Sequence, residues 1–142
     1  MREAEKLRHG EVVELEIPSA PEYVGIVRQA VEGIARRMSF DASQVDDLKL
    51  AVGEACTNAV KYGRNHDGSS NVTVRCVVCC EALVVEVRNK IDESPSPQVP
   101  AEPDLDKEGG LGLYIMQQLV DEVDLSWETD TACVKLMKRL SG

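Results

Sequence analysis

Glu54 and Asn58 are the first residues in the sequence whose types and spacing could do chemistry. They lie four residues apart in a segment with helical spacing of apolar residues, so their side chains share one face of the predicted helix. Both offer oxygen atoms to a hard cation such as Mg²⁺, and the carboxylate could also accept a proton from a hydroxyl group. Lys61 continues this face. A solvated helix face has the same residue types, so the pair alone leaves both interpretations open.

A glycine-rich segment, Gly109-Gly110-Leu111-Gly112-Leu113, precedes a second run of helically spaced apolar residues. Glycines at the start of a helix let backbone N–H groups approach a phosphate, and the helix dipole favours the anion. No predicted strand leads directly into the segment, so it does not fit the dinucleotide-binding fingerprint. A simple loop-to-helix joint remains the alternative.

The segment before these glycines differs in composition from the rest of the chain. Residues 90–108 contain four prolines, many acidic residues and few large apolar ones. Proline excludes a regular helix or a central strand here. Loops of this length in compact domains are often lids or binding segments, so we expect a lid loop over residues 90–108.

The apolar periodicity and the turn residues predict the elements that must position these segments. The predicted order is β-α-α-β-β-loop-α-β-β, with Ser19 capping the first helix, Asp41 or Ser43 capping the second, and Gly63 ending it. The expected strands cover residues 11–17, 72–80, 83–87, 123–128 and 132–138, and the first two helices cover 20–38 and about 41–62. This order predicts an α+β, two-layer sandwich, in which three helices cover one face of a mixed sheet of about five strands.

Length and charge limit the class of protein. The 142 residues suit a single domain over 1–142, and the formal net charge of −9 disfavours direct binding to nucleic acid. No apolar run approaches the roughly 20 residues needed to cross a membrane. The first ten residues contain no apolar stretch typical of a signal peptide, and the five cysteines are an odd number, so we expect a cytoplasmic protein with reduced thiols and no membrane contact.

Taken together, the two segments resemble a known class of ATPases. An E-x-x-x-N helix, a strand hairpin, a long lid and a G-x-G-L helix in this order are similar to the GHKL class, which includes gyrase, Hsp90 and histidine kinases. VGEACTNAV over residues 52–60 and EGGLGLYIM over 108–116 resemble the anti-sigma-factor serine kinases in particular. The resemblance covers nearly the whole chain.

The resemblance implies a site for ATP and Mg²⁺ between the helices and the lid. Asn58 would bind Mg²⁺ and Glu54 would act as general base toward a substrate serine. Gly110 and Gly112, within the segment 109–113, would hold phosphate oxygens, and Lys61 would lie near them. The resemblance also implies a homodimer with two protein partners: a STAS-type anti-anti-sigma substrate, and a sigma factor held inactive.

One family motif is altered in this chain. The family ends its central strand with D-x-G-x-G, in which the aspartate binds the adenine amino group. Here Asn89, Ile91 and Glu93 occupy the conserved positions, although a shifted register would place Asp92 in the adenine role. Asn89 still offers a carbonyl oxygen. Three functions therefore stay open: an ATP-dependent kinase, a relative that binds a protein partner without ATP, and an unrelated α+β domain.

Overall fold

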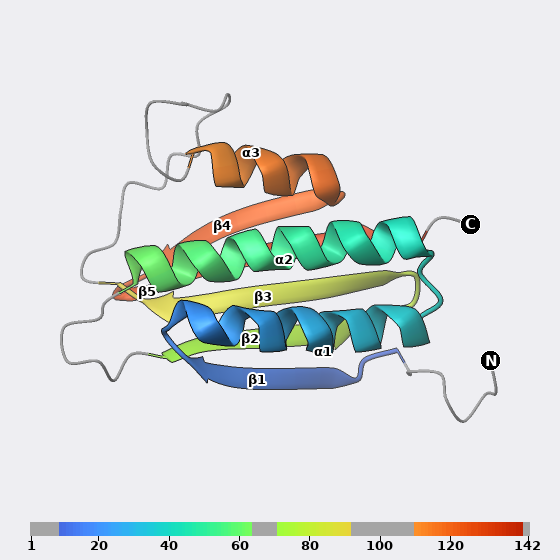
Figure 1. Ribbon diagram of the computed structural model, residues 1–142, viewed down its shortest axis with the longest axis horizontal. Coiled ribbons are helices and arrows are strands. Elements are labelled where there is room, and N and C mark those ends of the chain that lie inside the picture. Colours follow the sequence, from blue (N-terminus) through green and yellow to red (C-terminus); the bar gives the residue numbers. More distant parts are fainter. Residues whose placement is uncertain (1–8, 64–70, 92–109, 141–142) are drawn as a thin grey trace.

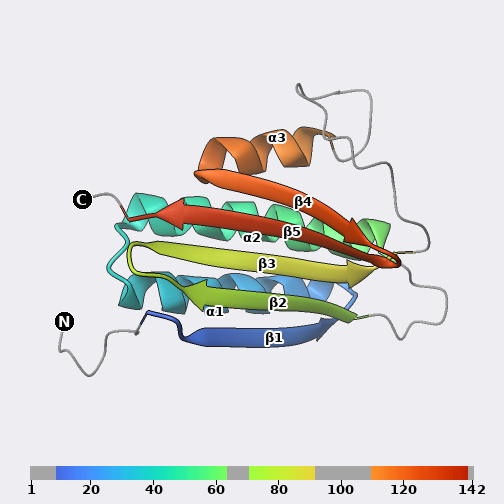
Figure 2. The ribbon, with the colours of Figure 1, turned by 180° about the vertical axis from the view of Figure 1, so that it is seen from behind.

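The structure is a computed structural model that describes residues 9–63, 71–91 and 110–140. Two layers make up the fold, a five-stranded sheet and a layer of helices on one of its faces (Figures 1 and 2). The elements are β1 (Val12–Pro18), a 3-10 turn η2 (Pro21–Tyr23), α1 (Val24–Arg37), α2 (Ala42–Tyr62), β2 (Asn71–Val78), β3 (Ala82–Lys90), α3 (Gly110–Leu119), β4 (Glu122–Glu128) and β5 (Thr131–Arg139). The predicted α+β architecture and element order are confirmed.

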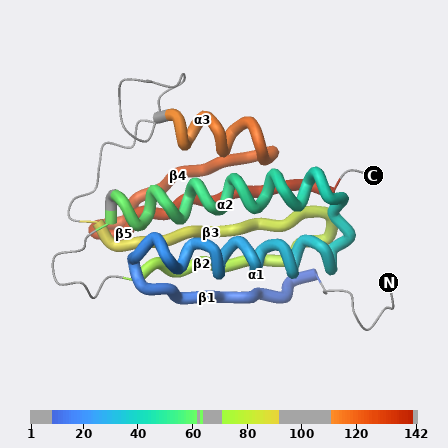
Figure 3. Tube along the Cα trace, in the orientation of Figure 1, coloured from blue at the N-terminus to red at the C-terminus, as the bar shows by residue number. Residues whose placement is uncertain are grey.

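The sheet is antiparallel throughout, so the predicted mixed sheet was wrong. The strand order is β1-β2-β3-β5-β4, and every neighbouring pair is antiparallel. Two consecutive helices follow β1 and bring the chain back to the end where β1 finished, as Figure 3 shows. The single helix between β3 and β4 does give these two strands the same direction, but β5 lies between them and runs the opposite way.

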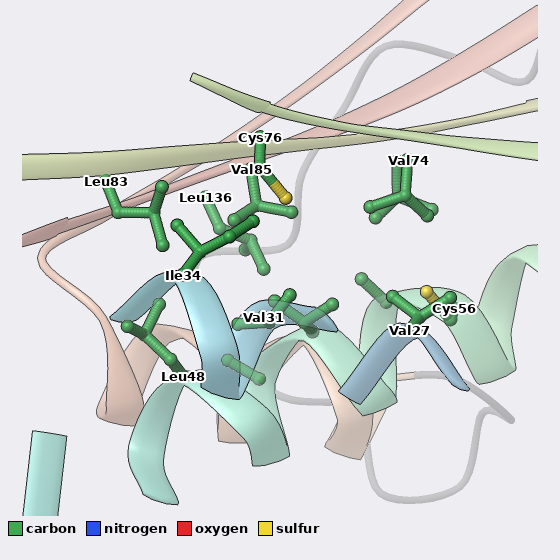
Figure 4. Close-up of a cluster of buried hydrophobic side chains, with 14 of the residues drawn as sticks. Val27, Val31, Ile34, Leu48, Cys56, Val74, Cys76, Leu83, Val85 and Leu136 are labelled. Atoms are coloured by element: carbon green, nitrogen blue, oxygen red, sulfur yellow. The ribbon is translucent and has the colours of Figure 1, made fainter. Parts of the chain in front are cut away.

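The core lies between the sheet and the helices. Alternate residues of β2 and β3 are buried against α1 and α2, as expected for strands with one covered face. Figure 4 shows Ile34 of α1 pointing toward Val85 of β3 and Leu136 of β5, and Val31 of α1 belongs to the same buried cluster. Aliphatic side chains dominate this core, and burying each one stabilises the fold by about 1.5–3 kcal/mol.

Side-chain capping fixes the start of α2. The Asp41 carboxylate accepts a hydrogen bond from the Gln44 backbone N–H at 2.8 Å, and the Gln44 side chain accepts one from the Asp41 N–H at 3.2 Å. This capping box confirms Asp41 as the cap. Ser19, in contrast, does not cap the first helix, because the chain forms the turn η2 after an extended Ala20 and α1 begins only at Val24.

The third strand is longer than the sequence predicted. β3 continues through Arg88, Asn89 and Lys90, because β2 pairs with it as far as Asn89 and β5 pairs with it along its whole length. Lys90, predicted to begin the lid, is therefore part of the sheet. The rest of the predicted lid, except Ile91, lies outside the described residues.

Candidate functional site

The two predicted segments meet where α3 crosses α2. Glu54 and Asn58 are half-buried on α2, and Gly112 of α3 is buried beside them. A Cβ atom on Gly112 would lie 3.1 Å from Asn58 Nδ2, 3.1 Å from Glu54 Oε2 and 3.6 Å from Asn58 Oδ1. The absence of a side chain at Gly112 therefore lets the first turn of α3 lie directly against the two polar side chains.

This arrangement suits a cation bound to a phosphorylated ligand. Glu54 Oε2 and the side-chain amide of Asn58 both lie beside Gly112, with the amide nitrogen nearer than the amide oxygen. Oxygen atoms, which both side chains possess, are the ligands that Mg²⁺ prefers. The first N–H groups of α3 have no partner within the helix and bear the positive end of its dipole. Divalent cation and phosphate would find complementary groups at this junction, so the residues present fit Mg-ATP.

The other predicted residues of the glycine-rich segment have different environments. Leu111 is exposed, whereas Leu113 is half-buried and packs against the core. Gly110 is the first residue of α3, and Gly109 lies outside the described residues. Lys61 is exposed in the last turn of α2, near the same end of the molecule as the start of α3 (Figure 1).

Asn89 is held at the end of α2. Its Nδ2 donates hydrogen bonds to the carbonyl oxygens of Ala59 and Lys90, both at 3.3 Å. A Cβ atom on Gly63 would lie 2.6 Å from the Ala59 oxygen and 3.0 Å from Asn89 Nδ2. Gly63 has an extended backbone rather than a left-handed one, so glycine is required here for space. The hydrogen bond from Asn89 to Ala59 and the close packing at Gly63 hold the end of β3 against the last turn of α2.

Ile91 follows Asn89 and is buried at the edge of the core. Its backbone N–H donates to the Asp130 carbonyl at 2.7 Å, while Lys90 Nζ lies 3.3 Å from the Asp130 carboxylate. The hydrogen bond from Lys90 holds the pKa of Asp130 below its ordinary value. These contacts join the end of β3 to the β4–β5 turn. Asp92 and Glu93 lie outside the described residues.

Two residues that were not among the predicted site residues help to position α2, α3 and β3. Gly63 was predicted only as a helix end, and no sequence signal indicated its contact with Asn89. Lys138 Nζ donates to the Leu119 carbonyl at 2.7 Å and lies 3.5 Å from Asp47, so it ties α3 to α2 and β5. The alternation of inward and outward side chains along β5 could have indicated Lys138, because it lies on the same inward face as Val134 and Leu136.

The chain is similar in sequence to a known protein family and to individual members of it. Residues 17–138 match the family model described as the histidine kinase-like ATPase domain. The serine-protein kinase RsbW of Bacillus velezensis is 40% identical over 139 residues, which cover 92% of this chain and 86% of that protein. The serine-protein kinase RsbW of Bacillus subtilis is 36% identical, with 94% and 89% covered.

Solved structures are similar in fold. The chain superimposes on a structure of the RsbU and RsbW domains of a Mycobacterium tuberculosis protein with a TM-score of 0.72 and 18% identity, covering 93% of this chain and 33% of that one. The histidine kinase domain of a blue-light activated kinase from Erythrobacter litoralis gives a TM-score of 0.54 and 22% identity, covering 94% and 65%. At these identities the likeness concerns the fold alone. Among the described residues, no helix is both long and apolar enough to cross a membrane.

Proposed function

The chain belongs to the histidine kinase-like ATPase family, and from this premise we propose that it is an ATP-dependent protein serine kinase and anti-sigma factor. The observation that supports this most is the contact of Gly112 with both Glu54 and Asn58. This contact lies between the α2 residues to which we assign the cation and the N-terminal end of α3, to which we assign the phosphates. The relatives named serine-protein kinases align over most of their length, which supports the same activity.

Each residue of the junction has a distinct role in this proposal. Asn58 holds Mg²⁺ through its side-chain oxygen, and the N–H groups at Gly110 and Gly112 bind phosphate oxygens. Glu54 accepts the proton of the substrate serine as its hydroxyl attacks. Lys61, Gly109, Leu111 and Leu113 complete the nucleotide site. When bound, ATP would supply the γ-phosphoryl group to the serine oxygen and leave as ADP.

Asn89 takes the place of the adenine-binding aspartate. Its Nδ2 is engaged by the carbonyls of Ala59 and Lys90, so the remaining polar atom is Oδ1, the acceptor that an adenine amino group needs. Ile91, at a position where the family has a glycine, is buried at the edge of the core.

The partners follow from the same proposal. The substrate is a small STAS-type anti-anti-sigma protein, and the second partner is a sigma factor held inactive. The chain acts as one domain over residues 1–142, as a homodimer in the cytoplasm, and has no direct contact with nucleic acid or membrane.

A phosphotransfer assay tests the proposal. Wild-type protein is incubated with radiolabelled ATP, Mg²⁺ and a STAS-type protein that carries a serine. We expect Glu54→Gln to abolish transfer while nucleotide binding persists, and Asn58→Ala to abolish both. Glu128→Gln, at an exposed position on β4, serves as the control and leaves both unchanged. Equal transfer by wild type and Glu54→Gln would remove Glu54 from the mechanism.

A regulatory protein that binds its partner without ATP is the second candidate. The altered motif favours it, because Ile91 and Glu93 stand where the family has glycines. This candidate predicts tight partner binding with and without Mg-ATP, and no labelled substrate. Partner affinity that depends on Mg-ATP and is lost in Asn58→Ala excludes it.

A further inference from the structure

A cavity lies at the end of the fold away from the candidate nucleotide site. It opens where α1 passes to α2 and where β2 turns into β3, at the right of Figure 1. Its volume is about 420 Å³, within the range of about 300–1,000 Å³ that is typical of small-molecule sites. Roughly 24 Å of helix separates Ala42, at the start of α2, from Asn58. The cavity is therefore distinct from the junction of α2 and α3.

Backbone hydrogen bonds hold the walls of this cavity in place. The Gly10 N–H donates to the Val78 carbonyl at 2.6 Å, and the Leu140 N–H donates to the Glu81 carbonyl at 2.7 Å. The turn between β2 and β3 is thus bound on one side by the residues before β1 and on the other by the residue after β5. Ser39, which also lines the cavity, has a left-handed backbone with φ 70° and ends α1 sharply. These constraints make the cavity a formed feature of the fold.

Two neighbouring thiols line the cavity. Cys79 and Cys80 both belong to the turn between β2 and β3. Cys80 is exposed, whereas Cys79 is half-buried and its Sγ lies 3.9 Å from the Val77 carbonyl, to which it donates. Cys80 is therefore the thiol that a molecule entering the cavity reaches first.

The charge beside these thiols is positive. Arg37 lines the cavity together with His9, and no Asp or Glu among the described residues does so, although Glu81 follows Cys80 in the sequence. The Arg37 guanidinium stays charged, and its Nη1 donates to the Gly33 carbonyl at 2.9 Å, which leaves its other N–H groups for a further partner. On a chain whose net charge is −9, such a local cation favours an anionic ligand.

The rest of the lining is mostly apolar. Met38, Val78 and Leu140 contribute aliphatic surface, and Ser39 adds a hydroxyl group. Apolar walls with a few polar groups are typical of sites that bind small molecules. A small sulfur compound with carboxylate groups would find a cation, an apolar wall and an exposed thiol here.

We propose that Cys80 is a modification site, at which a small anionic disulfide enters the cavity and forms a mixed disulfide with the protein. The Arg37 guanidinium binds a carboxylate of the incoming molecule and orients its sulfur atoms toward Cys80. Exposed thiols near a cation are the ones that react most readily. The inference goes beyond the proposed function, because it uses no residue of the nucleotide site.

The reaction is a thiol–disulfide exchange. The Cys80 thiol loses its proton, and the thiolate attacks one sulfur of the small disulfide. The S–S bond of that molecule breaks as a bond forms between this sulfur and Cys80 Sγ. The other sulfur leaves as a thiolate and takes up a proton. Cys80 is oxidised and the leaving half of the disulfide is reduced, so the exchange needs no other oxidant.

Oxidised glutathione, which has several carboxylates, is the probe for the modified residue. Reduced protein is incubated with it at pH 8, and mass spectrometry of the intact chain and of its peptides follows the adduct. We expect the first adduct at Cys80 in the wild type and in Cys79→Ser, and loss of this fast adduct in Cys80→Ser. A first adduct at Cys79 or Cys133 overturns the proposal.

Charge removal tests the role of Arg37. We expect Arg37→Gln to slow the reaction of Cys80 with oxidised glutathione about threefold or more, because the attraction to the carboxylates is lost. The reaction with uncharged 2-hydroxyethyl disulfide stays at the wild-type rate. Arg36→Gln is the matched control, since it removes the same charge from the same helical turn at a residue that pairs with Glu32 and does not line the cavity. It reacts like the wild type with both reagents.

Circular dichroism confirms that each variant is folded. An Arg37→Gln variant that keeps the wild-type rate with oxidised glutathione overturns the proposal, as does one that is slowed equally with both reagents. Mg-ATP binding by the same variants separates this inference from the proposed function. A chain that binds no Mg-ATP would still form the adduct at Cys80, and a chain without the adduct would still bind Mg-ATP.

Discussion

Gly112 connects the two halves of the candidate site at the scale of single residues. Glu54 and Asn58 contribute oxygens from α2, but they form a site only where the backbone of α3 lies against them. Any side chain at this position would lie against Glu54 and Asn58, in the volume where we propose that the cation and phosphate bind.

We predict that Gly112→Ala weakens Mg-ATP binding by about tenfold or more. The added methyl group lies 3.1 Å from both polar side chains, so α3 or the side chains must move. Isothermal titration measures the affinity. Gly25→Ala in α1 is the matched control, because a Cβ there meets nothing within 4 Å; it preserves binding and stabilises the helix by up to about 1 kcal/mol. Equal affinities for Gly112→Ala and wild type would contradict the assignment.

The five cysteines should differ in reactivity. Burial raises the pKa of the Cys56 thiol to about 12 and that of Cys76 to about 11. Both therefore stay protonated and shielded at neutral pH, and the thiolate is the reactive form. Cys80 is exposed and lines, with Cys79, an open cavity of about 420 Å³. We expect alkylation at pH 8 followed by mass spectrometry to label Cys80 first. Early labelling of Cys56 in folded protein would disagree with its burial.

At the scale of elements, Lys138 anchors the C-terminal end of α3. Its side chain is 12% exposed; it donates a hydrogen bond to the Leu119 carbonyl and forms an ion pair with the Asp47 carboxylate. Because α3 is only 10 residues long, it depends on such contacts for its position.

We predict that Lys138→Met lowers the free energy of unfolding by about 1–3 kcal/mol, since it removes a hydrogen bond from a charged group and leaves Asp47 without its cation. Denaturant unfolding at fixed protein concentration measures the change. Arg139→Met breaks only the exposed ion pair with Glu122, so it should cost less than about 1 kcal/mol. Equal losses in the two variants would show that Lys138 has no special role.

The ion pair between Glu32 and Lys49 joins α1 to α2 and makes a pH-dependent contribution to the free energy of unfolding. The hydrogen bond from Lys49, at 2.6 Å, is the main cause that lowers the pKa of Glu32 from 4.5. A carboxylate with a lowered pKa stabilises the folded state above its ordinary pKa, and this contribution is lost as the pH falls through the lowered value.

The melting-temperature difference between wild type and Lys49→Met should therefore be largest above about pH 5 and shrink in more acidic solution. Thermal unfolding followed by circular dichroism between neutral and acidic pH measures it. A difference that stays constant over this range would show that the pair does not couple to folding.

Local signals in the sequence were sufficient to predict most elements. The two hairpins and the three helices could be predicted from periodicity and turn chemistry, and the cap of α2 could be narrowed to Asp41 or Ser43. The sequence could not reveal the insertion of β5 between β3 and β4, because strand order depends on long-range pairing. The strand predicted over 83–87 was also shorter than β3. The polar end of β3 is stabilised by pairing with neighbouring strands rather than by the strand preference of its own residues.

At the scale of the whole molecule, tertiary packing brings together described site residues from α2 and α3. Sequence spacing indicated that Glu54 and Asn58 share a helix face, but the contact with Gly112 depends on how α3 packs across α2. The hydrogen bond from Asn89 to the Ala59 carbonyl of α2 likewise depends on tertiary structure. The chemistry that we propose for the site rests on residue types, whereas the packing of α3 against α2 could not be predicted from them.

The central claim is that this junction binds Mg-ATP, and thermal unfolding with and without the nucleotide tests it most directly. A ligand that binds the native state at about 100 times its Kd adds about 2.7 kcal/mol of stability. We predict that saturating Mg-ATP raises the melting temperature of the wild-type protein by several degrees and leaves Asn58→Ala unchanged. A folded wild-type protein whose melting temperature does not move at millimolar Mg-ATP would contradict the account.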